Sequence, residues 1–280
     1  MSDSVRQQLA RDGFALVPGT VDGSFVSSVL AAVADVLRGP PHPDLLRDRA
    51  GSVRKITYPL ALDRRFLVAV AHPALVGLAS EISPCAHELV LTWEDVLYKP
   101  ALHGEAVPAH QDLALQSLPG PVYSLGVHLD DASDNPVWFL PGSHRLGPRT
   151  KAQVNALRER GGFVPVAPRS GDVLVHDVLC VHYSETNTSS RPRTTWYLEF
   201  RTLSQLRADG RWPESWAQQR RALLFHACAA RQAAGLEVAW PDLGPGETVE
   251  GWLERPSELR IPHVGHGVEY DVTSPWYHFA

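Results

Sequence analysis

The sequence predicts a mainly β fold with flanking helices, an α+β chain whose strands form a sandwich or a barrel. Between residues 89 and 202 the chain breaks into short segments rich in valine, leucine, tyrosine and tryptophan, separated by proline and glycine. Many short strands with turn residues between them are typical of sandwiches and barrels. Outside this region, apolar residues recur at helical spacing instead.

The 280 residues are expected to form a single domain, because no repeat, low-complexity block or linker divides the sequence. We expect a helical N-terminal part over about residues 1–88, a β core over about residues 89–202, and a C-terminal extension over about residues 203–280. The extension is too rich in tryptophan and tyrosine to be a disordered tail. It is therefore predicted to cover the core or the pocket.

Local signals predict the individual elements. A short helix over residues 4–12 precedes a strand over residues 14–18, which ends at a proline. The clearest helix spans residues 21–37, and Asp22 or Ser24 can cap its start. Helical spacing also predicts helices over residues 59–80, 151–160 and 215–234. The remaining predicted strands span residues 89–98, 122–129, 137–140, 163–166, 172–176 and 194–202.

Composition excludes several classes of function. The formal charge is −5 with no block of like charges, which argues against a nucleic-acid partner. The three cysteines are far apart and form no C-x-x-C pair, which argues against a thiolate metal site and a disulfide framework. The first residues do not resemble a signal peptide, and no apolar run approaches the ~18 residues of a membrane span. We therefore expect a cytoplasmic protein, a monomer or homodimer, with no membrane partner.

The strongest chemical signal lies in residues 107–112, where His110 and Asp112 are two positions apart. In an extended chain, residues i and i+2 point to the same face, so one metal ion can contact both side chains. Two histidines and one carboxylate, with open positions left over, form the ligand set of non-heme Fe(II) oxygenases. The sequence must then supply a second histidine.

The segment 171–182 contains two candidates for that ligand, His176 and His182. A polar turn after His182 leads to Arg191 and Arg193, nine and eleven residues further on. An arginine there lies on the returning strand and can hold a carboxylate close to the metal, because a guanidinium matches a carboxylate bidentately.

Together these residues resemble the phytanoyl-CoA dioxygenase family of Fe(II)- and 2-oxoglutarate-dependent oxygenases. The resemblance runs from about residue 5 to about residue 202, and residues 203–280 match nothing that we can place. Its motifs are the opening segment 11–19, His110-Gln111-Asp112, the turn at residues 135–144, Gly171-Asp172, and His182 with Ser184, Asn187, Ser189 and Arg193.

The resemblance implies a jelly-roll core, the double-stranded β-helix of cupins. It implies that His110, Asp112 and His182 bind Fe(II) and that dioxygen and 2-oxoglutarate are cosubstrates. Halogenating relatives lack the carboxylate that Asp112 provides, so this residue favours an oxygenation outcome.

The resemblance also implies how 2-oxoglutarate is held. Arg193 would pair with its distal carboxylate, and Ser184 would hydrogen-bond nearby. Lys99 lies in a stretch where some relatives contact the cosubstrate. Arg191 is the alternative to Arg193, because the sequence alone leaves the register of the returning strand open.

The chain departs from the family pattern at Asn135-Pro136, where relatives carry Asn-Gly, and in the strand before it, which lacks a tryptophan. Gly126 and His128 in that strand are expected to enlarge or re-tune the pocket. Candidate substrate-contacting residues are His103, Glu105, His128 and Trp138; the alternatives are a solvated loop for the first two and a core position for the tryptophan.

Four other histidines are expected to be structural. His176, beside Asp177, is interpreted as a partly buried strand-end residue, and His144 as part of a tight turn. His263 and His266 have a spacing that suits a second metal ion, but they lie among proline and glycine, so a structural or pocket-lining role is favoured.

The predicted function is oxidation of a small, polar molecule by hydroxylation or oxidative cyclisation, with release of succinate and carbon dioxide. The unplaced C-terminal extension suggests a role in specialised-metabolite or antibiotic biosynthesis. The alternatives are a cupin-like metal-dependent isomerase or epimerase, and a small-molecule binding protein, neither of which uses 2-oxoglutarate. Arg193 with Ser184 separates these functions, because a non-oxidative protein needs no carboxylate anchor there.

Overall fold

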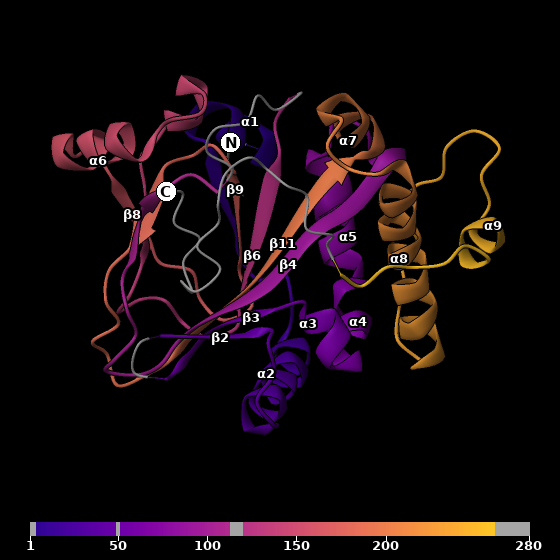
Figure 1. The fold of residues 1–280 in the computed structure, drawn as a ribbon, viewed down its shortest axis with the longest axis horizontal. Helices are drawn as coiled ribbons and strands as arrows, with labels where there is room; N and C mark the ends of the chain where they lie inside the picture. Colours follow the sequence, from indigo (N-terminus) through magenta and orange to yellow (C-terminus); the bar gives the residue numbers. More distant parts are fainter. Residues whose placement is uncertain (1–3, 49–50, 113–119, 261–280) are drawn as a thin grey trace.

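Two antiparallel sheets form the centre of the computed structural model, which describes residues 4–48, 51–112 and 120–260 (Figure 1). The strands are β1 (Phe14–Val17), β2 (Leu45–Arg47), β3 (Val53–Thr57), β4 (Leu89–Lys99), β5 (Val107–His110), β6 (Tyr123–His128), β7 (Val137–Phe139), β8 (Val164–Val166), β9 (Val173–Asp177), β10 (His182–Ser184) and β11 (Arg193–Thr202). The larger sheet has seven strands in the order β1-β9-β6-β11-β4-β3-β2. The smaller sheet has four, in the order β5-β10-β7-β8.

The eight strands from β4 to β11 form a jelly roll. Four of them, β4, β11, β6 and β9, are adjacent in the larger sheet, and the other four make up the smaller sheet. Apart from the β7–β8 pair, successive strands alternate between the two sheets. This is the double-stranded β-helix that the family resemblance implied, and β1, β2 and β3 extend its larger sheet at the edges.

Most of the helices, among them α2, α4, α5 and α8, cover the outer face of the larger sheet; the smaller sheet lies on its other side, with α6 beside it (Figure 1). They are α1 (Val5–Asp12), α2 (Gly23–Arg38), α3 (Pro59–Leu62), α4 (Arg64–Val70), α5 (Pro73–Ile82), α6 (Lys151–Arg160), α7 (Leu203–Asp209), α8 (Glu214–Ala233) and α9 (Val249–Leu253), with 3-10 turns at Ala86–Glu88 and Ser143–Leu146. The core between helices and sheet centres on Trp196 of β11, whose ring lies 5.5 Å from that of Phe66 and 6.5 Å from that of Phe25.

Side chains of β11 alternate between these two layers. Trp196 and Leu198 belong to the core beneath the helices. Because successive strand residues point to opposite faces, Arg193, Thr195 and Tyr197 point toward the smaller sheet. Strand β11 therefore presents polar side chains and a tyrosine to the interior between the two sheets and apolar side chains to the helices.

The sequence predicted most elements within one or two residues. Four predicted helices are present: the N-terminal one and those expected at residues 21–37, 151–160 and 215–234. The Asp22 carboxylate caps α2 by accepting from the Phe25 backbone N–H. The single helical stretch expected over residues 59–80 is wrong in detail. It forms three helices, because Asp63 caps a new start and Pro73 begins another.

Strands β2 and β3 were not predicted. Strand β3 is buried at every position although it contains Arg54 and Lys55. Two adjacent charged residues interrupt the apolar run that would otherwise indicate a buried strand. Arg54 forms a buried ion pair with Asp48, and Lys55 Nζ lies 2.5 Å from Asp95 Oδ2. Partners from other parts of the chain therefore make it possible to bury these charges.

The described part of the C-terminal extension covers the outer face of the larger sheet. Arg220 of α8 and Glu94 of β4 form an ion pair in which both side chains are fully buried. Arg220 Nε also donates to the Leu91 carbonyl at 2.8 Å. Trp252 of α9 stacks on Phe225 of α8 with ring centroids 5.4 Å apart. His263 and His266 lie outside the described residues.

In the described ranges, no single helix is long and apolar enough to cross a membrane. Helices α4 and α5 taken together pass that test of length and composition, but they are bent by 52° relative to each other.

The buried pair between Arg220 and Glu94 allows a test of how the extension is attached. Substituting Glu94→Ala leaves a buried guanidinium without its counter-charge, which should lower the free energy of unfolding by about 3–5 kcal/mol. Glu214→Ala breaks the exposed pair with Arg207 and should cost about 1 kcal/mol or less. Chemical denaturation of both variants measures the difference, and equal losses would contradict this role of the pair.

Candidate active site

Cross-strand pairing brings His110 and His182 together. His110 ends β5 and His182 begins β10, and the two residues are direct partners in the antiparallel ladder. Their rings lie 4.3 Å apart. Asp112 follows two residues later, where its backbone N–H donates to the Val178 carbonyl at 2.9 Å. Its Oδ1 is 3.2 Å from His110 Nε2 and 3.7 Å from His182 Nε2.

These three side chains can hold a metal ion, because one ligand atom from each lies within 4.8 Å of the others. His110 Nδ1 lies 2.8 Å from the Pro108 carbonyl and His182 Nδ1 lies 3.0 Å from the Cys180 carbonyl. A carbonyl only accepts, so each Nδ1 carries the proton and each Nε2 presents a lone pair. Burial, reinforced by His110, lowers the pKa of His182 to about 3, which keeps it a neutral ligand.

His176 holds the third group in place. Its Nε2 donates to Asp112 Oδ2 at 2.7 Å, which leaves Oδ1 directed at the two other imidazoles. Although burial opposes ionisation, the imidazoles of His182, His110 and His176 keep the pKa of Asp112 well below its usual range. Sequence reasoning assigned His176 a structural role and missed this contact. The requirement that a metal-binding carboxylate be hydrogen-bonded through its free oxygen could have indicated such a partner.

Two buried basic residues lie away from the triad, on the inner face of the larger sheet, which is the face turned toward the smaller sheet. Arg193 begins β11 and Lys99 ends β4, and they are direct partners in the ladder. Lys99 Nζ donates to Ser184 Oγ at 2.8 Å and to the Glu185 carbonyl at 2.6 Å. Arg193 donates to the same hydroxyl at 3.3 Å and to the Asn135 carbonyl at 2.7 Å. Lys99, Ser184 and Arg193, all predicted from the sequence, are thus gathered at one place.

Within the described residues, no carboxylate lies at ion-pair distance from Arg193 or Lys99, although they are 2% and 0% exposed. Burial, together with the charge on Arg193, lowers the pKa of Lys99 to about 6. Buried charges are normally paired. This end of the site is therefore suited to an anionic ligand.

The structure separates the two candidate arginines. Arg191 is exposed and its guanidinium is 2.6 Å from Asp134 Oδ2, on the surface. Arg193 is buried beside Lys99 and Ser184. Only Arg193 is placed to contact a ligand between the sheets.

Gly126 and Tyr197 lie on the inner face of the larger sheet, between the triad and the pair of Arg193 and Lys99. They are cross-strand partners, and a Cβ on Gly126 would lie 3.0 Å from Tyr197 Cε1. The absence of a tryptophan at this strand therefore leaves room for the Tyr197 ring. Burial, with smaller contributions from Asp112 and Asp95 against Arg193, raises the pKa of Tyr197 to about 12. Sequence reasoning did not identify Tyr197, because its placement depends on the register of β11.

The predicted substrate-contacting residues are placed in different parts of the molecule. His128 is buried on the inner face of β6. Trp138 stacks on Tyr183 with ring centroids 5.9 Å apart, whereas its neighbour Phe139 stacks on His182. Because neighbours in a strand alternate, Trp138 lies on the face of the smaller sheet that is turned away from the triad.

Other predicted residues lie outside the triad as well. His103 and Glu105 are exposed in the loop between β4 and β5, where the His103 carbonyl accepts from Arg54 at 2.7 Å. His144 packs against Gly13, whose φ of +84° and missing Cβ allow an approach that any side chain would block.

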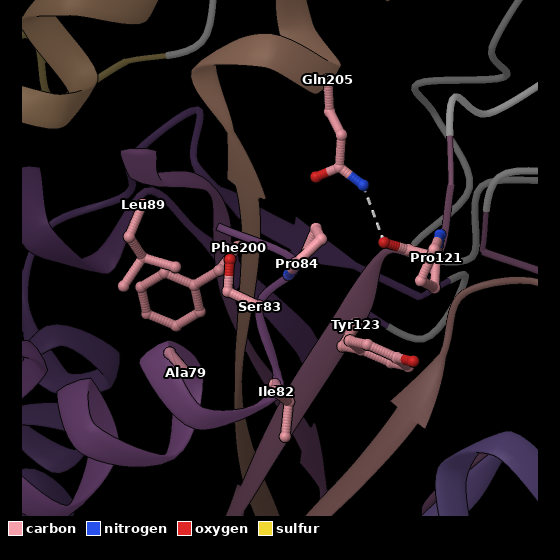
Figure 2. Close-up of a pocket in the computed structure, with 9 residues that line it drawn as sticks. All are labelled: Ala79, Ile82, Ser83, Pro84, Leu89, Pro121, Tyr123, Phe200 and Gln205. Carbon is pink, nitrogen blue, oxygen red and sulfur yellow. Dashed lines mark hydrogen bonds between the residues drawn. The ribbon is translucent and has the colours of Figure 1, made fainter. Parts of the chain in front are cut away.

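A small hollow lies elsewhere, on the helix side of the larger sheet (Figure 2). It is lined by Ala79, Ile82, Ser83, Pro84, Leu89, Pro121, Tyr123, Phe200 and Gln205. None of these is a candidate ligand, and the Gln205 amide across it donates to the Pro121 carbonyl at 2.8 Å. The hollow is not part of the candidate active site.

The sequence matches the family model described as phytanoyl-CoA dioxygenase (PhyH) over residues 9–195, more than half of the chain. The chain belongs to the phytanoyl-CoA dioxygenase family. The match includes the whole triad, Arg193 and Lys99. A comparison with curated proteins gave no match.

Solved structures share the fold of this phytanoyl-CoA dioxygenase family member. AviO1 from Streptomyces viridochromogenes Tue57 is 25% identical, with a TM-score of 0.61 over 70% of this chain and 93% of that one. EvdMO1 is 27% identical, with a TM-score of 0.62 over 71% of this chain, which spans about half (49%) of EvdMO1. EvdO2 from Micromonospora carbonacea var. aurantiaca, complexed with 2-oxoglutarate, is 25% identical, with a TM-score of 0.57 over 72% of this chain and 91% of that one.

The contact between His176 and Asp112 predicts a loss of metal affinity when it is removed. His176→Phe keeps a ring of similar size but cannot donate to Asp112 Oδ2, so Fe(II) affinity should fall by about 10- to 100-fold. His144→Phe, at a histidine outside the triad, is the matched control. Anaerobic metal titration measures both, and equal affinities for His176→Phe and the unsubstituted protein would exclude the proposed contact.

The lowered pKa of Lys99 predicts that anion binding depends on pH. Its amine is mostly neutral above about pH 6, whereas a carboxylate bound beside it favours the ammonium form. Affinity for a dicarboxylate such as 2-oxoglutarate should therefore be greatest below about pH 6 and fall as pH rises, by up to about tenfold per pH unit. Calorimetric titration of the iron-loaded protein measures this slope. Lys99→Met should flatten it, and an unchanged slope would show that another group titrates.

Proposed function

We propose that this chain is an Fe(II)- and 2-oxoglutarate-dependent oxygenase that oxidises a small, polar molecule and releases succinate and carbon dioxide. The observation that carries the proposal is an interior between the two sheets that holds a His-Asp-His group at one end and, at the other, buried Arg193 and Lys99 without an acidic partner among the described residues. Membership of the phytanoyl-CoA dioxygenase family supports it. So does the 2-oxoglutarate bound in the related EvdO2 structure.

The residues fit both groups. Two neutral imidazole nitrogens and one carboxylate oxygen are the donor set preferred by non-heme Fe(II), and His110, His182 and Asp112 supply them. Arg193 and Lys99 would take the distal carboxylate of 2-oxoglutarate, with the Ser184 hydroxyl between them. With both groups bound, the site supplies oxidation of a substrate by dioxygen coupled to decarboxylation of the keto acid.

The chain's own side chains prepare that chemistry by fixing positions. His176 and the carbonyls of Pro108 and Cys180 orient the three metal-binding groups before any ligand arrives. The Arg193 guanidinium offers a planar, permanently charged fork to the carboxylate. The two sheets bury this end of the site, so water competes weakly for the anion.

We further propose that the substrate is converted by hydroxylation or oxidative cyclisation, in specialised-metabolite or antibiotic biosynthesis. The alternatives are a metal-dependent isomerase or epimerase and a binding protein that do not use 2-oxoglutarate. Arg193 and Lys99 favour the oxygenase: buried charges are normally paired, the described residues supply no carboxylate to them, and the distal carboxylate of 2-oxoglutarate would provide one.

Succinate release tests the proposal. Purified protein with Fe(II), dioxygen and 2-oxoglutarate should release succinate, faster when a panel of small polar molecules contains the substrate. Asp112→Ala should abolish release. Arg193→Ala should raise the KM for 2-oxoglutarate at least tenfold, roughly the loss of a charge-assisted hydrogen bond.

Arg191→Ala is the matched control, because it removes an arginine from the same turn that pairs with Asp134 on the surface. Its KM should stay within about twofold. If Arg191→Ala raised the KM and Arg193→Ala did not, the anchor would be misassigned. If Asp112→Ala kept full activity, the metal assignment would fail.

A further inference from the structure

His128 lies beside Arg193 at the end of the inner face that is farthest from the triad. It ends β6 and is the direct ladder partner of Thr195 in β11. Arg193 is two residues from Thr195 on the same face, which makes it the diagonal neighbour of His128. At the other end of β6, Ser124 is paired with His176. The wall of β6 therefore runs from the metal-binding end to His128.

The polar atoms of His128 have no hydrogen-bond partner among the described residues. The side chain is 0% exposed, and neither Nδ1 nor Nε2 makes a hydrogen bond in the part of the chain that is described. Arg193 Nε, on the neighbouring strand, is buried and unpaired as well. Buried polar groups are nearly always hydrogen-bonded in native proteins. Unpaired atoms on two adjacent side chains therefore indicate a polar ligand between them.

The imidazole is neutral in this environment. Burial, together with the charge on Arg193, lowers the pKa of His128 to about 3. A neutral imidazole has one N–H donor and one acceptor nitrogen. It can donate to a carboxylate held by Arg193 without adding a second positive charge to a buried site.

We propose that His128 is a specificity-determining residue for the keto acid. Its ring closes the pocket next to Arg193, and its N–H binds the distal carboxylate, so a five-carbon diacid fits and a six-carbon diacid does not. This inference rests on the proposed use of 2-oxoglutarate. It extends that function by proposing that one side chain of β6 selects the chain length of the cosubstrate.

Gly126, two residues before His128 on the same face, supports the assignment. It has no side chain, and the Tyr197 ring lies against it. Between Ser124 and the end of β6, His128 is therefore the one large side chain that this strand places on the inner face. Shortening it opens space at the carboxylate end alone.

Calorimetry on the iron-loaded, full-length protein without oxygen tests the proposal with 2-oxoglutarate and 2-oxoadipate, which is one methylene longer. The unsubstituted protein should prefer 2-oxoglutarate by about tenfold or more. In His128→Ala the preference should fall to within about twofold, because the cavity now accepts the extra methylene. His128→Phe keeps the ring but not the donor, so it should bind both acids more weakly and still prefer the shorter one.

His144→Ala is the matched control and should leave the preference unchanged, while melting temperatures show that each variant is folded. A purely structural His128 would change the melting temperature of His128→Ala without changing its preference, and that result overturns the inference alone. If the unsubstituted protein bound neither acid, the proposed function and this inference would both fall. Should His128→Ala not fold, His128→Asn tests the same change in length.

Discussion

The pairing of β5 with β10 is the constraint on which the rest of the site depends. It places His110 opposite His182, and the chain after β5 then carries Asp112 to both of them. Backbone carbonyls hold both imidazoles in one tautomer, and His176 holds the carboxylate from the facing sheet. The smaller sheet therefore assembles the triad and the larger sheet fixes its carboxylate, so a change of register between β5 and β10 would separate the two histidines.

The larger sheet adds the second half of the site. Strands β4 and β11 run side by side, and their pairing puts Lys99 next to Arg193 in the interior. Burial of these charges opposes folding unless a ligand or a polar partner compensates, and Ser184 of β10 provides only part of that compensation. The helices on the outer face pack against this sheet, including α8, which contacts β4 through the buried pair of Arg220 and Glu94.

The sequence was informative where a role depends on local order along the chain. His110 and Asp112 are two residues apart, and that spacing alone indicates a shared face. The choice between Arg191 and Arg193 needed the register of β11, and the contacts of His176 and Tyr197 needed the pairing of four strands. Strand β3 escaped prediction for a related reason, because its buried Arg54 and Lys55 pair with Asp48, just after β2, and with Asp95 of β4.

A crystal structure of the protein grown without oxygen, with Fe(II) and 2-oxoglutarate, tests the central claim most directly. We expect the metal bound by His110, Asp112 and His182, and the far carboxylate of the acid in contact with Arg193. Metal bound by any other set of side chains, or an acid whose far carboxylate lies away from Arg193, would contradict this description of the site.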